Sequence, residues 1–205
     1  MPRLFLALVP PAGARRRLQA PLRLLSQLGE GVHPVRDEGV HLTLCFLGEV
    51  AGGREPAVRL AAAAVAAATP AWQLQLGELG CFPPRGSPRV LWLGVGGGTE
   101  QLRRLHQRLA EEVAALGWER EGRPFHPHFT LARAPGGLTA PQRAQFLELR
   151  RRLAAESRCT FLVSSLTLVE SVAQQSGGNL YRRRAAWRLP PVSGSPLEGA
   201  PVEAV

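Results

Sequence analysis

The sequence predicts an α+β protein built on antiparallel sheets. Short apolar runs typical of strands are interspersed with longer runs at helical spacing, without the strict alternation that produces a parallel βαβ sheet. Hydrophobic residues make up 45% of the 205 residues, which is enough to build the core of one ordinary domain or of two small lobes. The second half of the chain also resembles the first half in outline.

A strand and a helix are expected to open the chain. Residues 3–9 form a short apolar run that ends at two prolines, which is typical of a buried strand. Leucines then recur at helical spacing over 12–28, where Pro21 should kink the helix and Gly29 should end it.

The rest of the first half is expected to contain four strands and one helix. The alanine-rich stretch 54–69 is expected to be helical. Its most apolar run, 61–68, is short and flanked by Arg59 and Pro70, so we interpret it as part of a packed helix. The expected strands are 32–36, 40–50, 72–79 and 89–96, with a turn at 37–39 and a loop at 81–88.

The second half begins with a helix for which Thr99 is the expected N-cap and Gly117 the stop. We assign residues 1–188 to a single domain. The last residues, 189–205, are rich in Pro, Gly and Ser, so we expect a disordered tail. The other expected elements are a loop at 118–125, a strand at 126–133, a helix at 140–155, a strand at 160–172 and a strand at 180–189.

Charge and cysteine content narrow the class of protein. The formal net charge is +9, and all 25 basic residues are arginines, whose planar guanidinium matches phosphate oxygens. Part of this charge fits a GC-rich coding bias, but a polyanion is still a reasonable partner. The three cysteines have neither zinc-site nor disulfide-framework spacing. With no signal peptide or membrane span in view, we expect a cytoplasmic protein.

One short motif occurs once in each half of the chain. His-Leu-Thr-Leu at 41–44 and His-Phe-Thr-Leu at 128–131 share the pattern His-x-Thr-Leu. Composition alone predicts only about 0.17 His-x-Thr motifs in a chain like this. Since residues i and i+2 of a strand share a face, each motif presents one imidazole and one hydroxyl together.

Two such pairs facing one cleft would suit acid–base catalysis at a phosphodiester. A neutral imidazole takes a proton from the attacking group, and an imidazolium gives one to the leaving oxygen. Thr43, Thr130 and Arg133 would hold the non-bridging oxygens. The sequence therefore predicts His41 and His128 as the catalytic pair.

These residues resemble the two-histidine phosphoesterases, and longer matches point to their RNA 2′,3′-cyclic phosphodiesterase branch, once named 2′-5′ RNA ligase. The resemblance runs through nearly the whole chain up to about residue 188. It is carried by the stretches RLFLALVPP, HLTLCFLGEV, CFPPRGSPRVLWLGV, RPFHPHFTLAR and LVESVAQQSGGNLYRRRAAWRL.

The resemblance implies a bilobal fold with two pseudo-symmetric lobes of antiparallel sheet, flanked by helices, around a central cleft. It implies hydrolysis of a terminal 2′,3′-cyclic phosphate to a 2′-phosphate without a metal or another cofactor, with His128 as base and His41 as acid. Reversible ligation to a 5′-hydroxyl would use the same groups. The expected partner is RNA with cyclic ends, such as tRNA fragments, and we expect a monomer with no obligate protein partner and no membrane attachment.

Two positions depart from the expected pattern. Cys45 occupies the next same-face position after Thr43 under strict alternation, where relatives often carry a basic residue; we expect a packed thiol there rather than a nucleophile. Arg133 lies five residues after His128, which alternation sends to the opposite face. It reaches the cleft only if the strand ends or bends before it.

Other polar residues have both functional and structural interpretations. His126 could pair with His128 and His41 around a metal, but few acidic residues lie near, so a supporting role is expected. His106 is expected to be solvated on its helix. Possible RNA contacts are Tyr181, Arg182 and, as a base platform on a loop, Phe82, while Phe46 and Trp92 are expected in the core.

Three classes of function remain open at this point. The first is a phosphodiesterase acting on RNA ends. The second keeps the chemistry but changes the substrate to a small cyclic nucleotide, a 2′-5′ oligonucleotide or a phosphopantetheine-like diester. The third is a non-catalytic RNA-binding module, which the intact His and Thr of both motifs disfavour, since binding alone could use arginine throughout.

Overall fold

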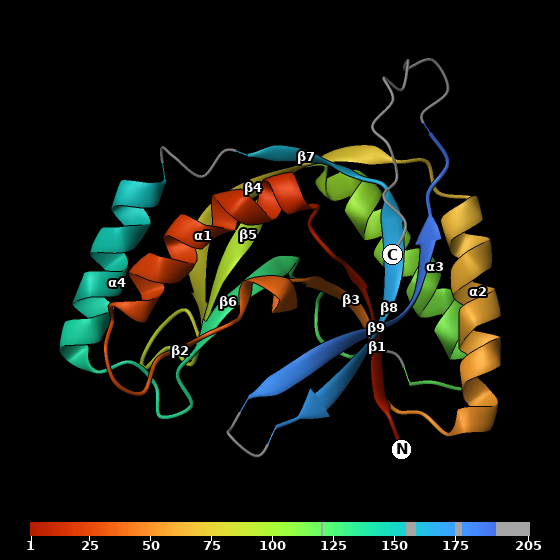
Figure 1. Ribbon diagram of the computed structural model, residues 1–205, viewed down its shortest axis with the longest axis horizontal. Coiled ribbons are helices and arrows are strands. Elements are labelled where there is room, and N and C mark those ends of the chain that lie inside the picture. The colour runs from red at the N-terminus through yellow and green to blue at the C-terminus, as the bar shows by residue number, and fades with distance from the viewer. Residues whose placement is uncertain (120, 155–158, 175–177, 192–205) are drawn as a thin grey trace.

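The strands form one antiparallel sheet that runs through the whole molecule (Figure 1). The structure, a computed structural model, describes residues 1–119, 121–154, 159–174 and 178–191. The order is β7-β4-β5-β6-β3-β1-β8-β9, and β2 pairs with β6 beside this path. The strands are β1 (Arg3–Leu8), β2 (His33–Pro34), β3 (Leu42–Glu49), β4 (Trp72–Phe82), β5 (Val90–Gly97), β6 (His128–Arg133), β7 (Thr160–Val163), β8 (Ser165–Ala173) and β9 (Asn179–Arg188).

The strand order divides the sheet into two lobes of four main strands each. We call β3, β1, β8 and β9 the first lobe, and β6, β5, β4 and β7 the second lobe. The lobes meet at β3 and β6, which pair through Leu42 and Phe129, both completely buried. The predicted α+β fold with two antiparallel lobes is thus confirmed, and the two His-x-Thr motifs lie on the two strands at its centre.

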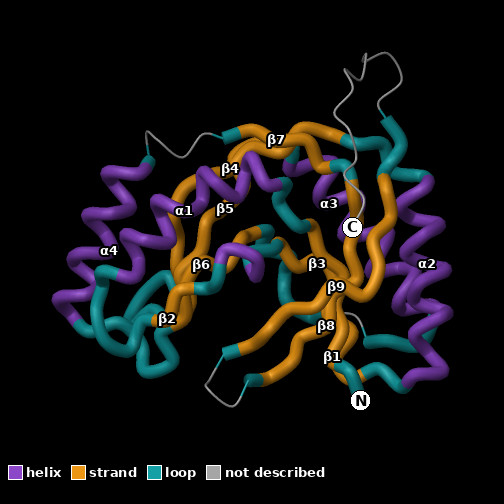
Figure 2. The backbone as a smooth tube through the Cα atoms, viewed as in Figure 1, coloured by secondary structure: helices purple, strands orange, loops and turns teal. Residues whose placement is uncertain are grey.

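Each lobe carries one helix from the first half of the sequence and one from the second half. The helices are α1 (Ala12–Ser26), α2 (Glu55–Ala67), α3 (Thr99–Ala115) and α4 (Ala140–Leu153). Helices α2 and α3 pack together against β3, β8 and β9 of the first lobe, whereas α1 and α4 pack against β4, β6 and β7 of the second. Figures 1 and 2 show the two pairs at opposite ends of the molecule, with strands between them. The lobes are therefore not the two halves of the chain.

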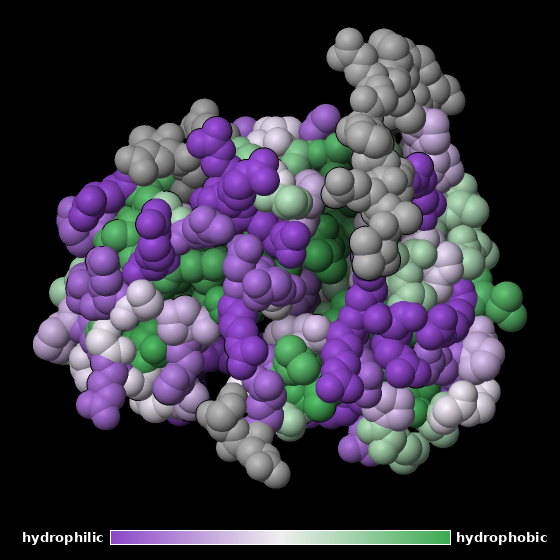
Figure 3. All heavy atoms as spheres, viewed as in Figure 1, coloured by the Kyte–Doolittle hydropathy of each residue, from purple (hydrophilic) through white to green (hydrophobic). Residues whose placement is uncertain are grey.

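The two faces of the sheet have different roles. Most buried side chains belong to one large cluster, formed by the helices and the sheet face that they cover. A small second cluster of Phe5, Ala7 and Val169, with the half-buried Tyr181 against it, is separate from this main core. In Figure 3 hydrophilic side chains gather over α1 and β9. No helix among the described residues is long and apolar enough to cross a membrane.

Several predicted boundaries are wrong, each for a local reason. Thr99 is not the cap of α3, because Gly98 takes the N-cap position with a φ of 74° that suits glycine. The expected strand 160–172 breaks at Ser164 into β7 and β8. The strand expected at 32–36 is limited to two residues, followed by a 3₁₀ turn η1 (Asp37–Gly39).

The start of the predicted tail also needs correction. Leu189 is buried, with 2% exposure, and its N–H donates to the Ser164 carbonyl at 2.9 Å. The Pro190 carbonyl accepts from the Ala71 N–H at 2.7 Å. These two residues therefore belong to the fold, and residues 192–205 of the predicted tail lie outside the described part of the chain.

Candidate active site

The two motifs form a square of four polar side chains at the centre of the sheet. Strands β3 and β6 are antiparallel and pair at Leu42 and Phe129, so this register sets His41 beside Thr130 and Thr43 beside His128. All four side chains are half-buried, while the leucines and the phenylalanine between them are buried. One face of the central strands thus carries both imidazoles and both hydroxyls, as the motif spacing predicts.

A β-bulge lies at the same place in both central strands. In β6, Trp92 of β5 pairs with Thr130 and Leu91 pairs with Ala132, so Leu131 is the extra residue. In β3, Ala7 of β1 pairs with Thr43 and Leu6 pairs with Cys45, so Leu44 is the extra residue. Each bulge lies three residues after its histidine and shifts the following residues to the opposite face.

The bulges determine which other side chains lie on the same face of the sheet as the square. Arg133 is exposed whereas Ala132 is buried, so the bend required for this arginine to reach the site is present. On β3 the same shift buries Cys45 and exposes Phe46, with 7% and 64% of their surfaces accessible. Cys45 is therefore not a same-face neighbour of Thr43, and the expectation that Phe46 lies in the core is wrong. Burial raises the pKa of the Cys45 thiol to about 12, which fits a packed group.

Both catalytic candidates are oriented by the same backbone contact. His41 Nδ1 lies 2.7 Å from the Gly39 carbonyl, and His128 Nδ1 lies 2.7 Å from the His126 carbonyl. Because a carbonyl can only accept, Nδ1 of each ring carries the hydrogen. Each ring therefore keeps Nε2 for other chemistry, as the base when neutral and the acid when protonated.

Aromatic rings surround His41 in the first lobe. Its ring centroid lies 4.7 Å from that of Phe5 and 4.6 Å from that of Tyr181, which meets it edge-on. Phe5 in turn contacts the exposed ring of Phe46 at 5.9 Å. The His41 side of the site thus has an apolar floor that continues to an exposed aromatic surface.

His128 has a corresponding surround in the second lobe. Its ring lies 5.1 Å from Phe82 and 5.9 Å from Trp92, and His126 contacts the same two rings at 5.1 and 4.9 Å. Phe82 is the last residue of β4 rather than a loop residue, and it packs against the histidine. His126 supports the site through its carbonyl and its ring.

Burial lowers the pKa of both histidines. Desolvation lowers the pKa of His41 to about 4, although its bond to the Gly39 carbonyl opposes this, and the charges of Arg133 and His128 lower it further. The pKa of His128 is also lowered, first by desolvation and then by the charges of His126 and Arg133. The positive charge of Arg133 therefore lowers the pKa of both rings, and in the free protein both rings favour the neutral form.

The two predicted RNA contacts on β9, Tyr181 and Arg182, lie on opposite faces of the strand. Tyr181 contacts His41 and Phe5, so it belongs to the site. Arg182 is the cross-strand neighbour of Glu170 and does not share the face of Tyr181. The structure therefore does not bring Arg182 into the site. Arg183, paired with Val169 of the small cluster, lies on the Tyr181 face, and strand alternation could have identified it.

His106 has a positioning role that its sequence context did not reveal. Its Nδ1 lies 2.8 Å from the Leu44 carbonyl at the β3 bulge, and its ring stacks on Phe125 at 3.9 Å. Trp118 donates to the Leu47 carbonyl at 2.8 Å. The predicted solvated position of His106 is thus wrong, because the side chain joins α3 to β3 and to the segment before β6.

The described residues contain no group of three or more His, Cys, Asp or Glu side chains placed to hold a metal ion. His126 and His128 lie 6.2 Å apart by ring centroids. Of the nitrogens of His128, Nδ1 is already engaged with a carbonyl. The side chains of the square are imidazoles and hydroxyls, with a guanidinium beside them, and this set suits an anion.

A bilobal antiparallel sheet with a His-x-Thr motif on each central strand defines the two-histidine phosphoesterase class. The profile of the 2′-5′ RNA ligase superfamily matches residues 10–175. The chain belongs to this family, which confirms the resemblance found in the sequence.

Curated relatives and solved structures agree with this assignment. The chain is 33% identical over 166 residues to an Aeropyrum pernix protein named RNA 2′,3′-cyclic phosphodiesterase, covering 79% of this chain and 91% of the relative. An Escherichia coli protein of the same name is 36% identical over 140 residues, covering 68% and 76%.

Two solved structures match nearly the full length of the chain. The crystal structure of TT0787 of Thermus thermophilus has a TM-score of 0.76 at 25% identity and covers 92% of this chain and 98% of its own. E. coli LigT complexed with 3′-AMP has a TM-score of 0.69 at 29% identity, covering 92% and 99%. The predicted two-histidine phosphoesterase fold is therefore confirmed.

Proposed function

We propose that this protein is an RNA 2′,3′-cyclic phosphodiesterase that hydrolyses a terminal 2′,3′-cyclic phosphate to a 2′-phosphate. The observation that carries the proposal is the pair of matching imidazoles, each held through Nδ1 by a carbonyl two residues earlier in the chain. Relatives that carry this name at 33% and 36% identity support the proposal.

The proposed reaction is an attack of water on the cyclic phosphorus. His128 Nε2 takes a proton from the water as its oxygen bonds to phosphorus. The bond from phosphorus to O3′ breaks, and His41 Nε2 gives its proton to that oxygen. The hydroxyls of Thr43 and Thr130 and the Arg133 guanidinium stabilise the charge that grows on the non-bridging oxygens.

The acid role of His41 requires that the substrate change its protonation. Since the pKa of the buried ring is about 4, the ring is neutral at pH 7 in the free protein. An anionic phosphate beside the ring favours the imidazolium and raises this pKa. We therefore propose that His41 becomes protonated when the substrate binds.

RNA ends, for example of tRNA fragments, are the proposed substrates of a monomeric enzyme, and reversible 2′-5′ ligation would exchange the roles of the two histidines. The proposed chemistry requires no metal. Cys45, Cys81 and Cys159 are free thiols, which fits a reducing compartment such as the cytoplasm.

The test is turnover of a short RNA that ends in a 2′,3′-cyclic phosphate, with EDTA present, by the wild type, His41→Ala and His128→Ala. We expect the wild type to form the 2′-phosphate and both variants to lose about 100- to 10,000-fold in kcat. Thr160→Ala, which changes an exposed threonine on β7, serves as the control and should retain full activity. Binding of the RNA without turnover by the wild type would instead support the RNA-binding module.

A further inference from the structure

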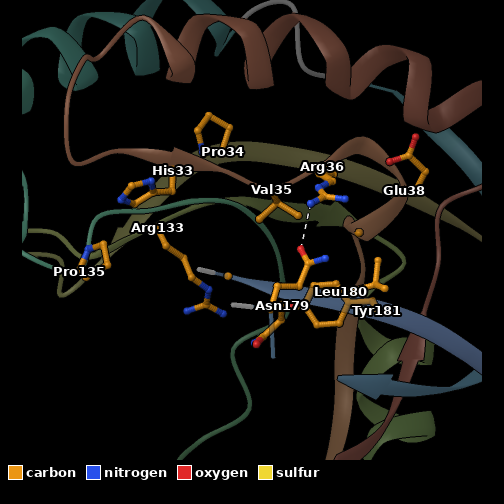
Figure 4. Close-up of a pocket in the computed structure, with 13 residues that line it drawn as sticks. His33, Pro34, Val35, Arg36, Glu38, Arg133, Pro135, Asn179, Leu180 and Tyr181 are labelled. Carbon is orange, nitrogen blue, oxygen red and sulfur yellow. Dashed lines mark hydrogen bonds between the residues drawn. The ribbon is translucent and has the colours of Figure 1, made fainter. Parts of the chain in front are cut away.

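A cavity of about 610 Å³ adjoins the proposed catalytic square. Its walls come from both lobes: the β2–η1 segment and the end of β6 on one side, and the β8–β9 hairpin on the other (Figure 4). This volume lies within the range of about 300–1,000 Å³ that is usual for small-molecule pockets. Its apolar walls include Pro34, Val35, Pro135 and Leu180.

The cavity is continuous with the groups that surround the catalytic histidine. Arg133, Gly39 and Tyr181 all line it. The Gly39 carbonyl accepts the bond from His41, and the Tyr181 ring meets the His41 ring. A ligand with a phosphate on the square can therefore extend past Arg133 into this cavity.

A second guanidinium stands in the wall of the cavity. The N–H of Val35 donates to the Leu131 carbonyl at 2.8 Å, which extends the β2–β6 pairing to the residue before Arg36. Arg36 Nη2 donates to the neutral amide oxygen of Gln174 at 2.9 Å, across the cavity. Among the residues that the structure describes, neither Arg36 nor Arg133 forms an ion pair with a carboxylate. Glu38 also lines the cavity, and in Figure 4 its carboxylate points away from Arg133.

We propose that this cavity binds the nucleotide that precedes the cyclic end, and that Arg36 holds the phosphodiester joining it to the terminal nucleotide. The inference rests on the proposed function and extends it from a chemistry to a substrate class. Apolar walls suit a nucleobase and ribose, and a guanidinium without a carboxylate partner suits a phosphodiester anion.

The opposite end of the square offers a different surface for the terminal nucleobase. Phe46 lies beyond Thr43 along β3, exposed and in contact with Phe5. This exposed ring provides a stacking surface for a base. The arginine in the same cross-strand row, Arg183, is separated from it by Phe5 and Val169. Since the terminal nucleoside is already fixed by its own cyclic phosphate, the cavity with Arg36 serves the next nucleotide. A mononucleotide has no second phosphate to place there, so the site favours RNA over small cyclic nucleotides.

The experiment compares three substrates: a 2′,3′-cyclic mononucleotide, the dinucleotide with the same cyclic end, and that dinucleotide with a neutral methylphosphonate linkage. Wild type should hydrolyse the natural dinucleotide with a kcat/KM about 10- to 100-fold above that of the other two. Arg36→Gln should lose this preference and keep the rate on the mononucleotide. Arg152→Gln, an exposed arginine on α4, is the matched control and should behave as wild type.

The outcomes separate this inference from the proposed function. If wild type hydrolyses all three substrates with similar efficiency, or if Arg36→Gln lowers all three rates equally, the cavity does not hold the preceding nucleotide, while the phosphodiesterase assignment stands. If wild type hydrolyses none of them, the proposed function itself fails.

Discussion

Strands β3 and β6 share a motif, a bulge and a carbonyl contact, yet they differ five residues after the histidine. There β6 carries Arg133 and β3 carries Phe46, both exposed. Their histidines also differ, since burial lowers the pKa of His41 to about 4 and produces a smaller lowering for His128. The same backbone arrangement therefore positions the histidine and threonine of each strand, whereas Arg133 on β6 and Phe46 on β3 make the site asymmetric.

The largest expected effect tests whether the two histidines have different roles. On a cyclic phosphate, His41→Ala and His128→Ala should each lose about 100- to 10,000-fold in kcat. On a p-nitrophenyl phosphodiester, whose leaving group needs no proton, His41→Ala should recover most of the lost rate and His128→Ala should not. Steady-state kinetics on both substrates would measure this. Equal recovery by the two variants would contradict the assignment of His41 as acid.

Arg133→Gln should have the next largest effect. The variant lacks the cation that lies near both histidines and that would stabilise the charge on the non-bridging oxygens. The value of kcat/KM should therefore fall about 10- to 100-fold. Because the positive charge of Arg133 lowers the pKa of both rings, the pKa of His41 and of His128 should rise in the variant. Titration of the imidazole resonances by NMR would measure the rise, and unchanged pKa values would place the guanidinium away from the square.

Phe46→Ala should weaken substrate binding with little effect on the chemical step. Loss of one stacking surface corresponds to about 1–3 kcal/mol, which would raise KM for RNA by about 5- to 150-fold. Leu60→Ala is the matched control, because Leu60 is also a large apolar side chain that is mostly exposed, with 74% of its surface accessible on α2. A fall in kcat at unchanged KM would contradict the binding role of Phe46.

The pH profile should show the smallest effect. Catalysis needs one proton shared between the histidines, so kcat/KM is greatest between their two macroscopic pKa values. Since both pKa values are lowered below 6.5, the maximum lies below pH 6.5. From pH 6.5 to 7.5 the value should fall about 5- to 10-fold. A maximum of kcat/KM above pH 7 would contradict the burial of the two rings.

The residues that could be predicted are those set by local spacing. His-x-Thr places an imidazole and a hydroxyl on one face of any strand, and leucines at helical spacing identify the buried side of α3. The β3 bulge could not be predicted, because residues 44–47 are all apolar and hide the change of phase that an extra residue causes. For that reason strict alternation puts Cys45 on the site face, and Phe46 is expected in the core, although the offset of Arg133 indicates that one strand must bend.

Contacts between segments far apart in the sequence could not be predicted either. The bond from His106 to the Leu44 carbonyl joins residues 62 positions apart. The cavity beside Arg133 combines the β2–η1 segment with the β8–β9 hairpin. Nothing in either segment alone indicates the other, so Arg36 could not be recognised as a candidate ligand for phosphate.

The exchange of helices between the lobes sets an order for folding during synthesis. The second lobe needs α1 from the start of the chain and is complete once β7 ends at Val163. The first lobe begins with β1 at Arg3 yet lacks its edge until β9 ends at Arg188. β1, the earliest strand made, therefore lacks its second neighbour until β8 has been made. Tyr181 of β9, which packs against His41, is made later still, so the surround of His41 is completed after that of His128.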